Sequence, residues 1–148
     1  MENRIQKDLV AAMKAKDAVR LASLRSIKTA ITVAKTAPNA PETLSDGDIQ
    51  KIIQKLVKQR KDSAEQYTAA GRQELADNEL AEMAIMEDYL PKQLTVEDMY
   101  AIIGTQKNIA GIHGTPFNIG VIMKYFKDNY SGQYDGKTLS TIAKEMIG

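Results

Sequence analysis

Apolar residues recur every three or four positions along most of this chain, which predicts helices rather than strands. The clearest run lies between residues 49 and 67 and contains Ile49, Ile52, Ile53, Leu56, Val57, Ala64 and Tyr67. This spacing places the apolar side chains on one face of a helix. No segment shows the alternation of apolar and polar residues that is typical of a half-buried strand. Aromatic residues are scarce and Trp is absent, which also favours helices. The sequence therefore predicts an all-α fold.

The helical pattern is interrupted at the segment EDYLPKQLT, where a run ending at Leu90 meets Pro91. A residue that precedes proline is displaced from the α region, so Leu90 is a predicted helix end. Thr95, with Asp98 three residues later, has the pattern of a new helix start. We therefore predict two domains: a long-helix hairpin or bundle over residues 1–91, and a compact three-helix domain over residues 92–148.

Within each part, turn and capping residues mark the expected helix ends. Ser45 and Asp48 resemble a capping box, and Gly71 is well placed to follow the end of a long helix. In the second part, Thr115 and Pro116 predict an N-cap followed by proline at the first helical position. In the first part we expect helices over 3–16, after Asp17, after Ser45 and over 73–90. In the second part we expect helices over 96–107, after Thr115 and after Asp135.

Several features exclude classes of protein. The chain has no Cys, which excludes disulfides and thiolate metal sites and is typical of a reducing compartment. The first ten residues carry charges throughout and do not resemble a secretory signal. No run approaches the roughly 18 apolar residues that span a bilayer. We therefore expect a cytoplasmic protein without a membrane partner.

Catalytic and metal-binding patterns are weak. His113 is the only histidine, and a zinc site needs three or four ligands. The GIHG segment matches the G-x-x-G loop of KH domains, but a flexible connector fits it better because no sheet is expected. Glu79 and Glu82 are spaced like carboxylate ligands in a helical bundle, yet they fall on the expected polar face with no His nearby. We predict no catalytic residue, no metal and no cofactor.

The near-neutral net charge of +1 hides a marked asymmetry. Residues 1–61 contain 13 Lys and Arg against 6 Asp and Glu, whereas residues 62–99 contain 2 against 10. One interpretation is that these are solvated helix faces that neutralise each other in the fold. The other is a basic surface for a polyanion, because each cation that contacts a phosphate releases condensed counterions. The candidate nucleic-acid-binding residues form the basic row, which we define as Lys51, Lys55, Lys58, Arg60, Lys61 and Arg72.

The sequence resembles the GatB/YqeY family along its whole length, and is closest in pattern to free-standing YqeY-like proteins. The matching segments are AMKAKD at 12–17, LR at 24–25, VKQRKDSAEQY at 57–67, AGRQELADNE at 70–79, YLPKQL at 89–94, Gly120 and Met123 within IGVIM, and GQYDGK at 132–137. Where the family often has Gly-Lys-Val-Met, this chain has Gly120-Val121-Ile122-Met123. The missing lysine weakens a phosphate-binding role for that segment.

The resemblance implies an all-α fold like the tail of the B subunit of the tRNA-dependent aspartyl/glutamyl amidotransferase, which helps to hold tRNA. The family label, carbon–nitrogen ligation with glutamine as amide donor, belongs to catalytic portions that have no counterpart here, and an activity of this chain alone is left open. Two hypotheses follow. The first is a non-catalytic RNA-binding module for tRNA or another structured RNA. The second is a protein-interaction adaptor that docks on a larger enzyme.

Overall fold

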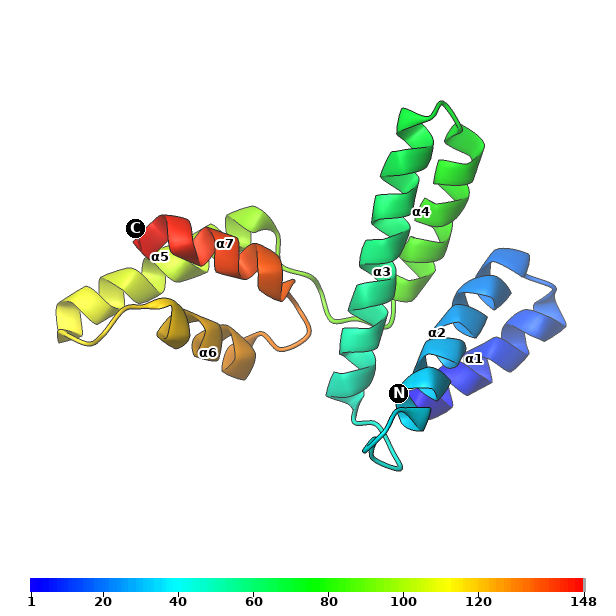
Figure 1. Ribbon diagram of the computed structural model, residues 1–148, viewed down its shortest axis with the longest axis horizontal. Helices are drawn as coiled ribbons and strands as arrows, with labels where there is room; N and C mark the ends of the chain where they lie inside the picture. Colours follow the sequence, from blue (N-terminus) through cyan, green and yellow to red (C-terminus); the bar gives the residue numbers. More distant parts are fainter. Residues whose placement is uncertain (148) are drawn as a thin grey trace. The chain divides into compact units, whose positions relative to one another are not determined.

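The computed structural model describes residues 1–147, and within them it contains seven α-helices and no strand (Figure 1). The helices are α1 (Glu2–Ala15), α2 (Ala18–Thr36), α3 (Asp46–Ala69), α4 (Gln73–Glu87), α5 (Val96–His113), α6 (Ile119–Asn129) and α7 (Gly136–Ile147). The all-α prediction is confirmed. Over residues 1–147, no helix is both long and apolar enough to cross a bilayer.

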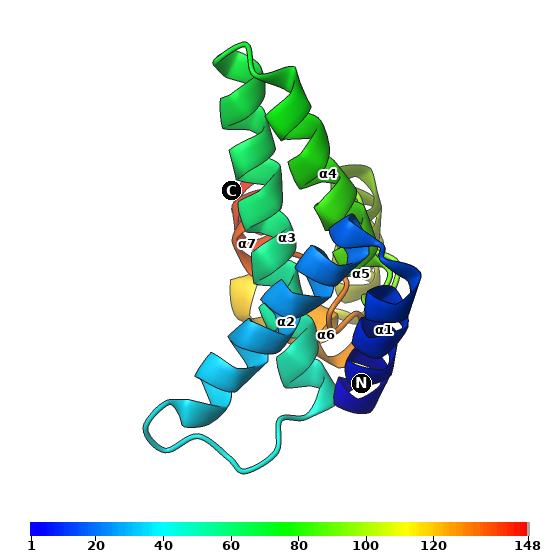
Figure 2. The ribbon, with the colours of Figure 1, turned by 90° about the vertical axis from the view of Figure 1, so that its right-hand side faces the viewer.

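The chain separates into two compact units, Met1–Pro91 with α1 to α4 and Lys92–Gly148 with α5 to α7. In the first unit, α3 and α4 form an antiparallel pair, and α2 packs against α1 and α4. Figures 1 and 2 both show the connected ends of α3 and α4 extending beyond α1 and α2. Each unit has its own core, so each can be described separately.

The core of the first unit joins all four helices. Its buried side chains are Ile5, Leu9, Ala12, Leu24, Ile27, Ile31, Ile49, Ile53, Met86 and Tyr89. Farther along the α3/α4 pair, the buried residues are Ala64 and Ala76. Small side chains at these positions let the two helices approach closely, so the extended part of the pair holds together with little apolar volume.

The core of the second unit is built around Phe126, which is fully buried. Its ring lies 5.5 Å from the rings of both Tyr130 and Tyr134. Met99 and Ile103 of α5 and Leu139 of α7 complete the same cluster. The chain has eight Phe and Tyr residues, and five of them lie in or against this short three-helix core.

Capping residues explain where most helices begin. Ser45 with Asp48, and Thr95 with Asp98, form complete capping boxes at the starts of α3 and α5, as the sequence predicted. The backbone N–H of Thr95 donates to the Asp98 carboxylate at 3.0 Å, and hydrogen bonding from Thr95 lowers the pKa of the Asp98 carboxyl. In return, the backbone N–H of Asp98 donates to the Thr95 hydroxyl oxygen at 3.0 Å.

The predicted N-cap at Thr115 is wrong, as is the predicted end of the preceding helix near residue 107. Helix α5 continues through His113 and ends at Gly114, which has a left-handed φ of 63°. Helix α6 begins only at Ile119, where the Asn118 side chain accepts a hydrogen bond from the backbone N–H of Val121. The pattern Thr-Pro is a valid helix start, but the Asn118 cap lies at the position from which Ile122 and Phe126 can reach the core.

Tyr89 fixes the end of the first unit next to Pro91. Its hydroxyl donates to the carboxylate of Asp8 at 2.5 Å, and the Arg4 guanidinium lies 4.5 Å from its ring centre. The ring is buried, at 4% exposure. Burial raises the pKa of the Tyr89 phenol far above its ordinary value of about 10, and the bond to Asp8 raises it further. These contacts of Tyr89 therefore hold α1 against the segment just before Pro91.

This raised pKa predicts a loss of stability in alkali. An unfolded tyrosine loses its proton near pH 10 while folded Tyr89 keeps it, so the free energy of unfolding should fall as pH rises above 10. The slope from this group approaches about 1.4 kcal/mol per pH unit. Urea unfolding of the first unit at pH 9, 10 and 11, followed by NMR signals from α1 and α4, should show a shallower decline in Tyr89→Phe. Tyr125→Phe, in the second unit, should leave the slope unchanged, and equal slopes for all three proteins would contradict this explanation.

Candidate nucleic-acid interface

The lysines of the basic row lie on the side of α3 that faces away from its core. Ile49 and Ile53 are buried on one side of the helix, and Lys51, Lys55 and Lys58 are exposed. At 3.6 residues per turn these three lysines fall within about 60° of one another around the helix axis. Lys61 is also exposed, roughly a quarter turn away. We call Lys51, Lys55, Lys58 and Lys61 the lysine row.

The four lysines of the row differ in the polar contacts that they make. Lys51, Lys55 and Lys61 form no ion pair within residues 1–147, whereas Lys58 makes polar contacts of its own. Lys51 and Lys61 are ten positions apart along the helix, so the row is about 15 Å long. Exposed ammonium groups at this spacing can reach several phosphates of one nucleic-acid backbone, because each is a compact charge on a flexible stem.

Arg60 does not belong to the exposed surface, because the adjacent helices hold its side chain. Its Nε lies 3.1 Å from a carboxylate oxygen of Glu82 and 3.6 Å from one of Glu79, and a terminal nitrogen donates to Ser26 Oγ at 3.0 Å. The arginine side chain is 20% exposed, and the two glutamates are 19% and 13% exposed. Arg60 therefore joins α2, α3 and α4.

The same contacts correct the interpretation of Glu79 and Glu82. Both were expected on a water-facing side of the fourth helix, but they point toward Arg60 on the packed side of α4. A guanidinium has several donors in a fixed fork, so it can pair with two carboxylates at once. This pairing offsets the cost of removing the carboxylates from water. Within residues 1–147 no group of three or more acidic or histidine side chains is arranged to hold a metal ion.

Arg72 is separated from the lysine row by the turn that ends α3. It is the residue before α4, where its side chain is exposed and forms no cap. Gly71 precedes it with a left-handed φ of 75°, as expected for the glycine after a helix end. Arg72 thus lies at the tip of the α3/α4 pair and extends no continuous row.

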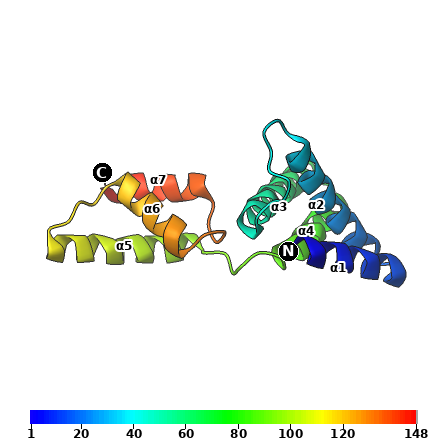
Figure 3. The ribbon, with the colours of Figure 1, turned by 90° about the horizontal axis from the view of Figure 1, so that it is seen from below.

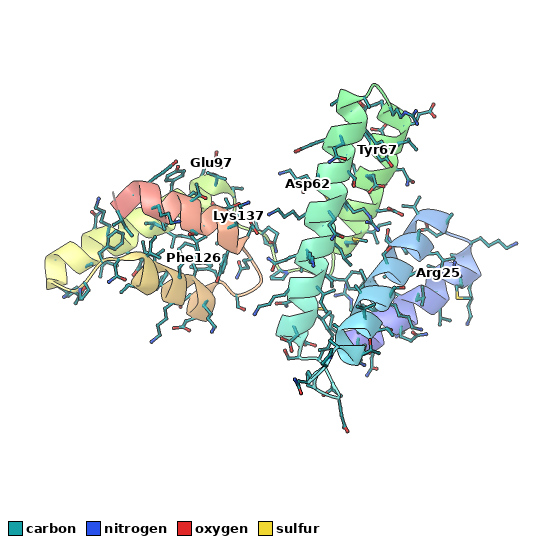
Figure 4. The ribbon with its side chains drawn as sticks, in the orientation of Figure 1. Arg25, Asp62, Tyr67, Glu97, Phe126 and Lys137 are labelled. Atoms are coloured by element: carbon teal, nitrogen blue, oxygen red, sulfur yellow. The ribbon has the colours of Figure 1, made fainter. Side chains whose placement is uncertain are left out.

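Two acidic residues continue the line of the lysine row along α3. Asp62 follows Lys58 by four residues and Glu65 follows Asp62 by three, so both fall on the same side of the helix as Lys51 and Lys55. Both are exposed, and Asp62 is labelled on α3 in Figure 4. The outward side of α3 is therefore basic near its start and acidic near its end. The spacing of Lys51, Lys55, Lys58, Asp62 and Glu65 in the sequence is enough to predict this boundary.

His113 and the pocket of the second unit give less support for a functional site than the lysine row does. His113 lies in the last turn of α5 rather than in a loop, and it is exposed. The second unit has an open pocket of about 290 Å³ beside the start of α5, lined by residues that include Lys92, Asp98, Ile102 and Tyr130. Asp98 is already used by the capping box there. The lysine row is an extended group of like charges on one side of one helix.

Comparison with known proteins gives the family. The sequence pattern that defines the Yqey-like proteins matches residues 2–147. The chain belongs to the YqeY-like protein family. This confirms the resemblance inferred from the segments between AMKAKD and GQYDGK.

Several fungal relatives carry the name "Altered inheritance of mitochondria protein 41, mitochondrial". The protein of Pyrenophora tritici-repentis is 25% identical over 146 residues, which is 98% of this chain and 80% of the relative. That of Candida glabrata is 30% identical over 92 residues, or 62% of this chain and 50% of the relative. That of Meyerozyma guilliermondii is 34% identical over 88 residues, or 60% and 45%. The chain thus spans about half the length of the latter two relatives.

The prediction of a cytoplasmic protein is wrong on this comparison, since these YqeY-like relatives are named as mitochondrial proteins. The physical reason is that a chain without cysteine suits any reducing compartment, and charged residues in the first ten positions do not identify one. Neither observation distinguishes one interior compartment from another.

The placement of Arg60 predicts that its replacement affects stability. Arg60→Gln should lower the free energy of unfolding of the first unit by roughly 2–4 kcal/mol, because Glu79 and Glu82 would remain partly buried without a cation. Lys61→Gln removes the same charge from the exposed neighbour and should change it by no more than about 0.5 kcal/mol. Urea unfolding followed by circular dichroism measures both. Similar values for the two variants would show that Arg60 is not a structural residue.

Proposed function

We propose that this YqeY-like protein is a non-catalytic RNA-binding module whose ligand is tRNA or another structured RNA. The observation that carries the proposal is the lysine row, which lies opposite the buried side of α3. Arg60 and Arg72 of the predicted basic row are left out, because one is held by glutamates and the other lies at the hairpin tip. The proposed contacts are Lys51, Lys55, Lys58 and Lys61.

The surroundings of the lysine row favour contact with the RNA backbone over stacking on bases. The aromatic residues that could have supplied a stacking platform are used elsewhere: Tyr89 and Phe126 are buried, and Tyr67 is half-buried on the side of α3 that meets α4 (Figure 4). Single-strand binding relies on bases stacked on exposed aromatic rings. Duplex RNA is recognised mainly by shape and by contacts to phosphates and sugars. A row of four exposed lysines about 15 Å long on one helix suits the second mode.

The alternative is an adaptor that docks on a larger enzyme. It is favoured by the exposed carboxylates of α4, which include Glu74, Asp77 and Glu87 and would repel RNA while attracting a basic protein surface. Affinity capture of the intact protein from a lysate, with and without nuclease, separates the two. A bound enzyme that survives nuclease supports the adaptor, and recovery of structured RNA alone supports the RNA-binding module.

Charge reversal in the lysine row tests RNA binding directly. Lys51→Glu with Lys55→Glu should weaken binding to a tRNA transcript by roughly tenfold or more at low salt, and should reduce the slope of log affinity against log salt by roughly 1–2. Filter binding at several salt concentrations measures both quantities. The matched control is Lys7→Glu with Lys14→Glu on α1, which changes the net charge equally at exposed positions. No tRNA binding by the unmodified protein, or equal losses in the two double variants, would reject the proposal.

Extending the lysine row should strengthen binding. Asp62→Lys places a cation where the outward side of α3 turns acidic, so it should raise tRNA affinity by roughly threefold to tenfold and steepen the salt dependence by up to about 1. Asp77→Lys makes the same charge change on α4 and serves as the control, since Asp77 is exposed but outside the row. The same titration measures both variants. An equal gain in both would indicate a general charge effect without a defined surface.

A further inference from the structure

The side of α5 that faces away from the core of the second unit is uncharged over most of its length. It carries Ala101, Thr105, Asn108, Ile109 and Ile112, all exposed, and we call these five residues the outer α5 face. Ile112 is 80% exposed and Ile109 is 43% exposed. Figure 3 shows that α6 and α7 both lie on one side of α5. An apolar and uncharged face of this kind marks an interaction surface.

The ammonium of Lys107 in α5 is directed away from the outer α5 face. Lys107 is the charged residue between Met99 and His113, and its ammonium donates to the backbone carbonyl of Met146 in α7, at 3.2 Å. The exposed Lys107 side chain is therefore directed toward α7. A highly charged partner such as RNA finds no counter-charge on the outer α5 face, so this surface is separate from the lysine row and does not depend on the proposed RNA binding.

The outer α5 face is complementary to itself when two copies run antiparallel. Ala101, Thr105, Asn108 and Ile112 are spaced by four, three and four residues, so they form one line along the helix. In an antiparallel pair centred between residues 106 and 107, the small Ala101 of one copy faces the large Ile112 of the other. Small residues opposite large ones allow two helices to interdigitate.

The two polar positions of the same line also match. In this arrangement Thr105 of one copy faces Asn108 of the other. The Thr105 hydroxyl donates to the backbone carbonyl of Ala101, at 3.0 Å, which leaves its oxygen free to accept a second hydrogen bond. The side-chain amide of Asn108 is an exposed donor. The polar centre can therefore be satisfied across the pair, as burial requires.

Charges at the helix ends select the antiparallel direction. Glu97 and Asp98 lie at the start of α5, while its last turn contains His113 and no carboxylate. A parallel pair would place four carboxylates together at one end, which like-charge repulsion disfavours. An antiparallel pair separates them and places each acidic start near the end of the other copy that carries His113.

From these observations we propose that the outer α5 face is a dimerisation surface whose occupant is α5 of a second copy, packed antiparallel around a two-fold axis. The same residues serve both copies, as in an isologous interface. One face of an 18-residue helix is smaller than the roughly 1,200–2,000 Å² buried in standard interfaces. The proposed dimer is accordingly of the weak, transient class, whose interfaces bury less than about 1,200 Å².

Sedimentation velocity of the full chain from 10 to about 500 µM tests the proposal. The weight-average mass should rise with concentration from the monomer value of 16.3 kDa toward twice that mass. Ile112→Glu should weaken association at least tenfold. The matched control is Val33→Glu, which makes the same change at a 64% exposed position on α2 and should leave association unchanged. Circular dichroism verifies that both variants keep their helices, as expected for exposed sites.

A second pair of variants tests the direction. Ala101→Glu alone and Ile112→Lys alone should both remain monomeric, because each places one charge against an apolar residue. The double variant should regain association that weakens with added salt, since opposite charges face each other only in the antiparallel arrangement. A constant monomer mass up to 500 µM, or equal effects of Ile112→Glu and Val33→Glu, would overturn the proposal. A double variant that stays monomeric would overturn the antiparallel pairing.

Discussion

The ion pairs of Arg60 with Glu79 and Glu82 act together with the buried Ile49 and Ile53 to set which side of the long helix α3 faces the core of the first unit. Arg60 lies on the packed side of α3, and its bonds to α4 and to Ser26 of α2 fix the rotation of α3 about its own axis. Because Lys51 and Lys55 lie on the opposite side of the same helix, that rotation decides which way they point. Arg60 was predicted to bind nucleic acid. In the structure it instead helps to orient the lysines of α3.

The buried polar groups of the chain are used in packing. The Ser23 hydroxyl, which is fully buried, donates to the backbone carbonyl of Val19 at 2.8 Å, and Tyr89 donates to Asp8. Among residues 1–147 no buried side-chain nitrogen or oxygen lacks a hydrogen-bond partner. The buried polar groups of the described residues therefore serve packing.

Much of the fold could be predicted from the sequence, because local signals and packing agree in most segments. The capping boxes at Ser45 and Thr95 and the glycine at Gly71 place helix ends through bonds within a few residues, so the sequence contains the whole interaction. The start of α6 could not be predicted in this way. Thr115 and Asn118 are both acceptable caps, and the choice between them depends on where Phe126 meets the aromatic core.

The candidate site shows the same division between local and distant information. The exposure of Lys51, Lys55 and Lys58 follows from their spacing relative to Ile49 and Ile53 on one helix. Whether Arg60 is exposed depends on the carboxylates of Glu79 and Glu82, which lie 19 and 22 residues farther along the chain. They contact Arg60 only because α4 turns back along α3. Helical periodicity gives the side of a helix on which a residue lies, but it does not tell whether an oppositely charged helix covers that side. For this reason a charged residue spaced halfway between two apolar ones, as Arg60 is between Val57 and Ala64, is better interpreted as an interhelical contact than as part of a binding surface.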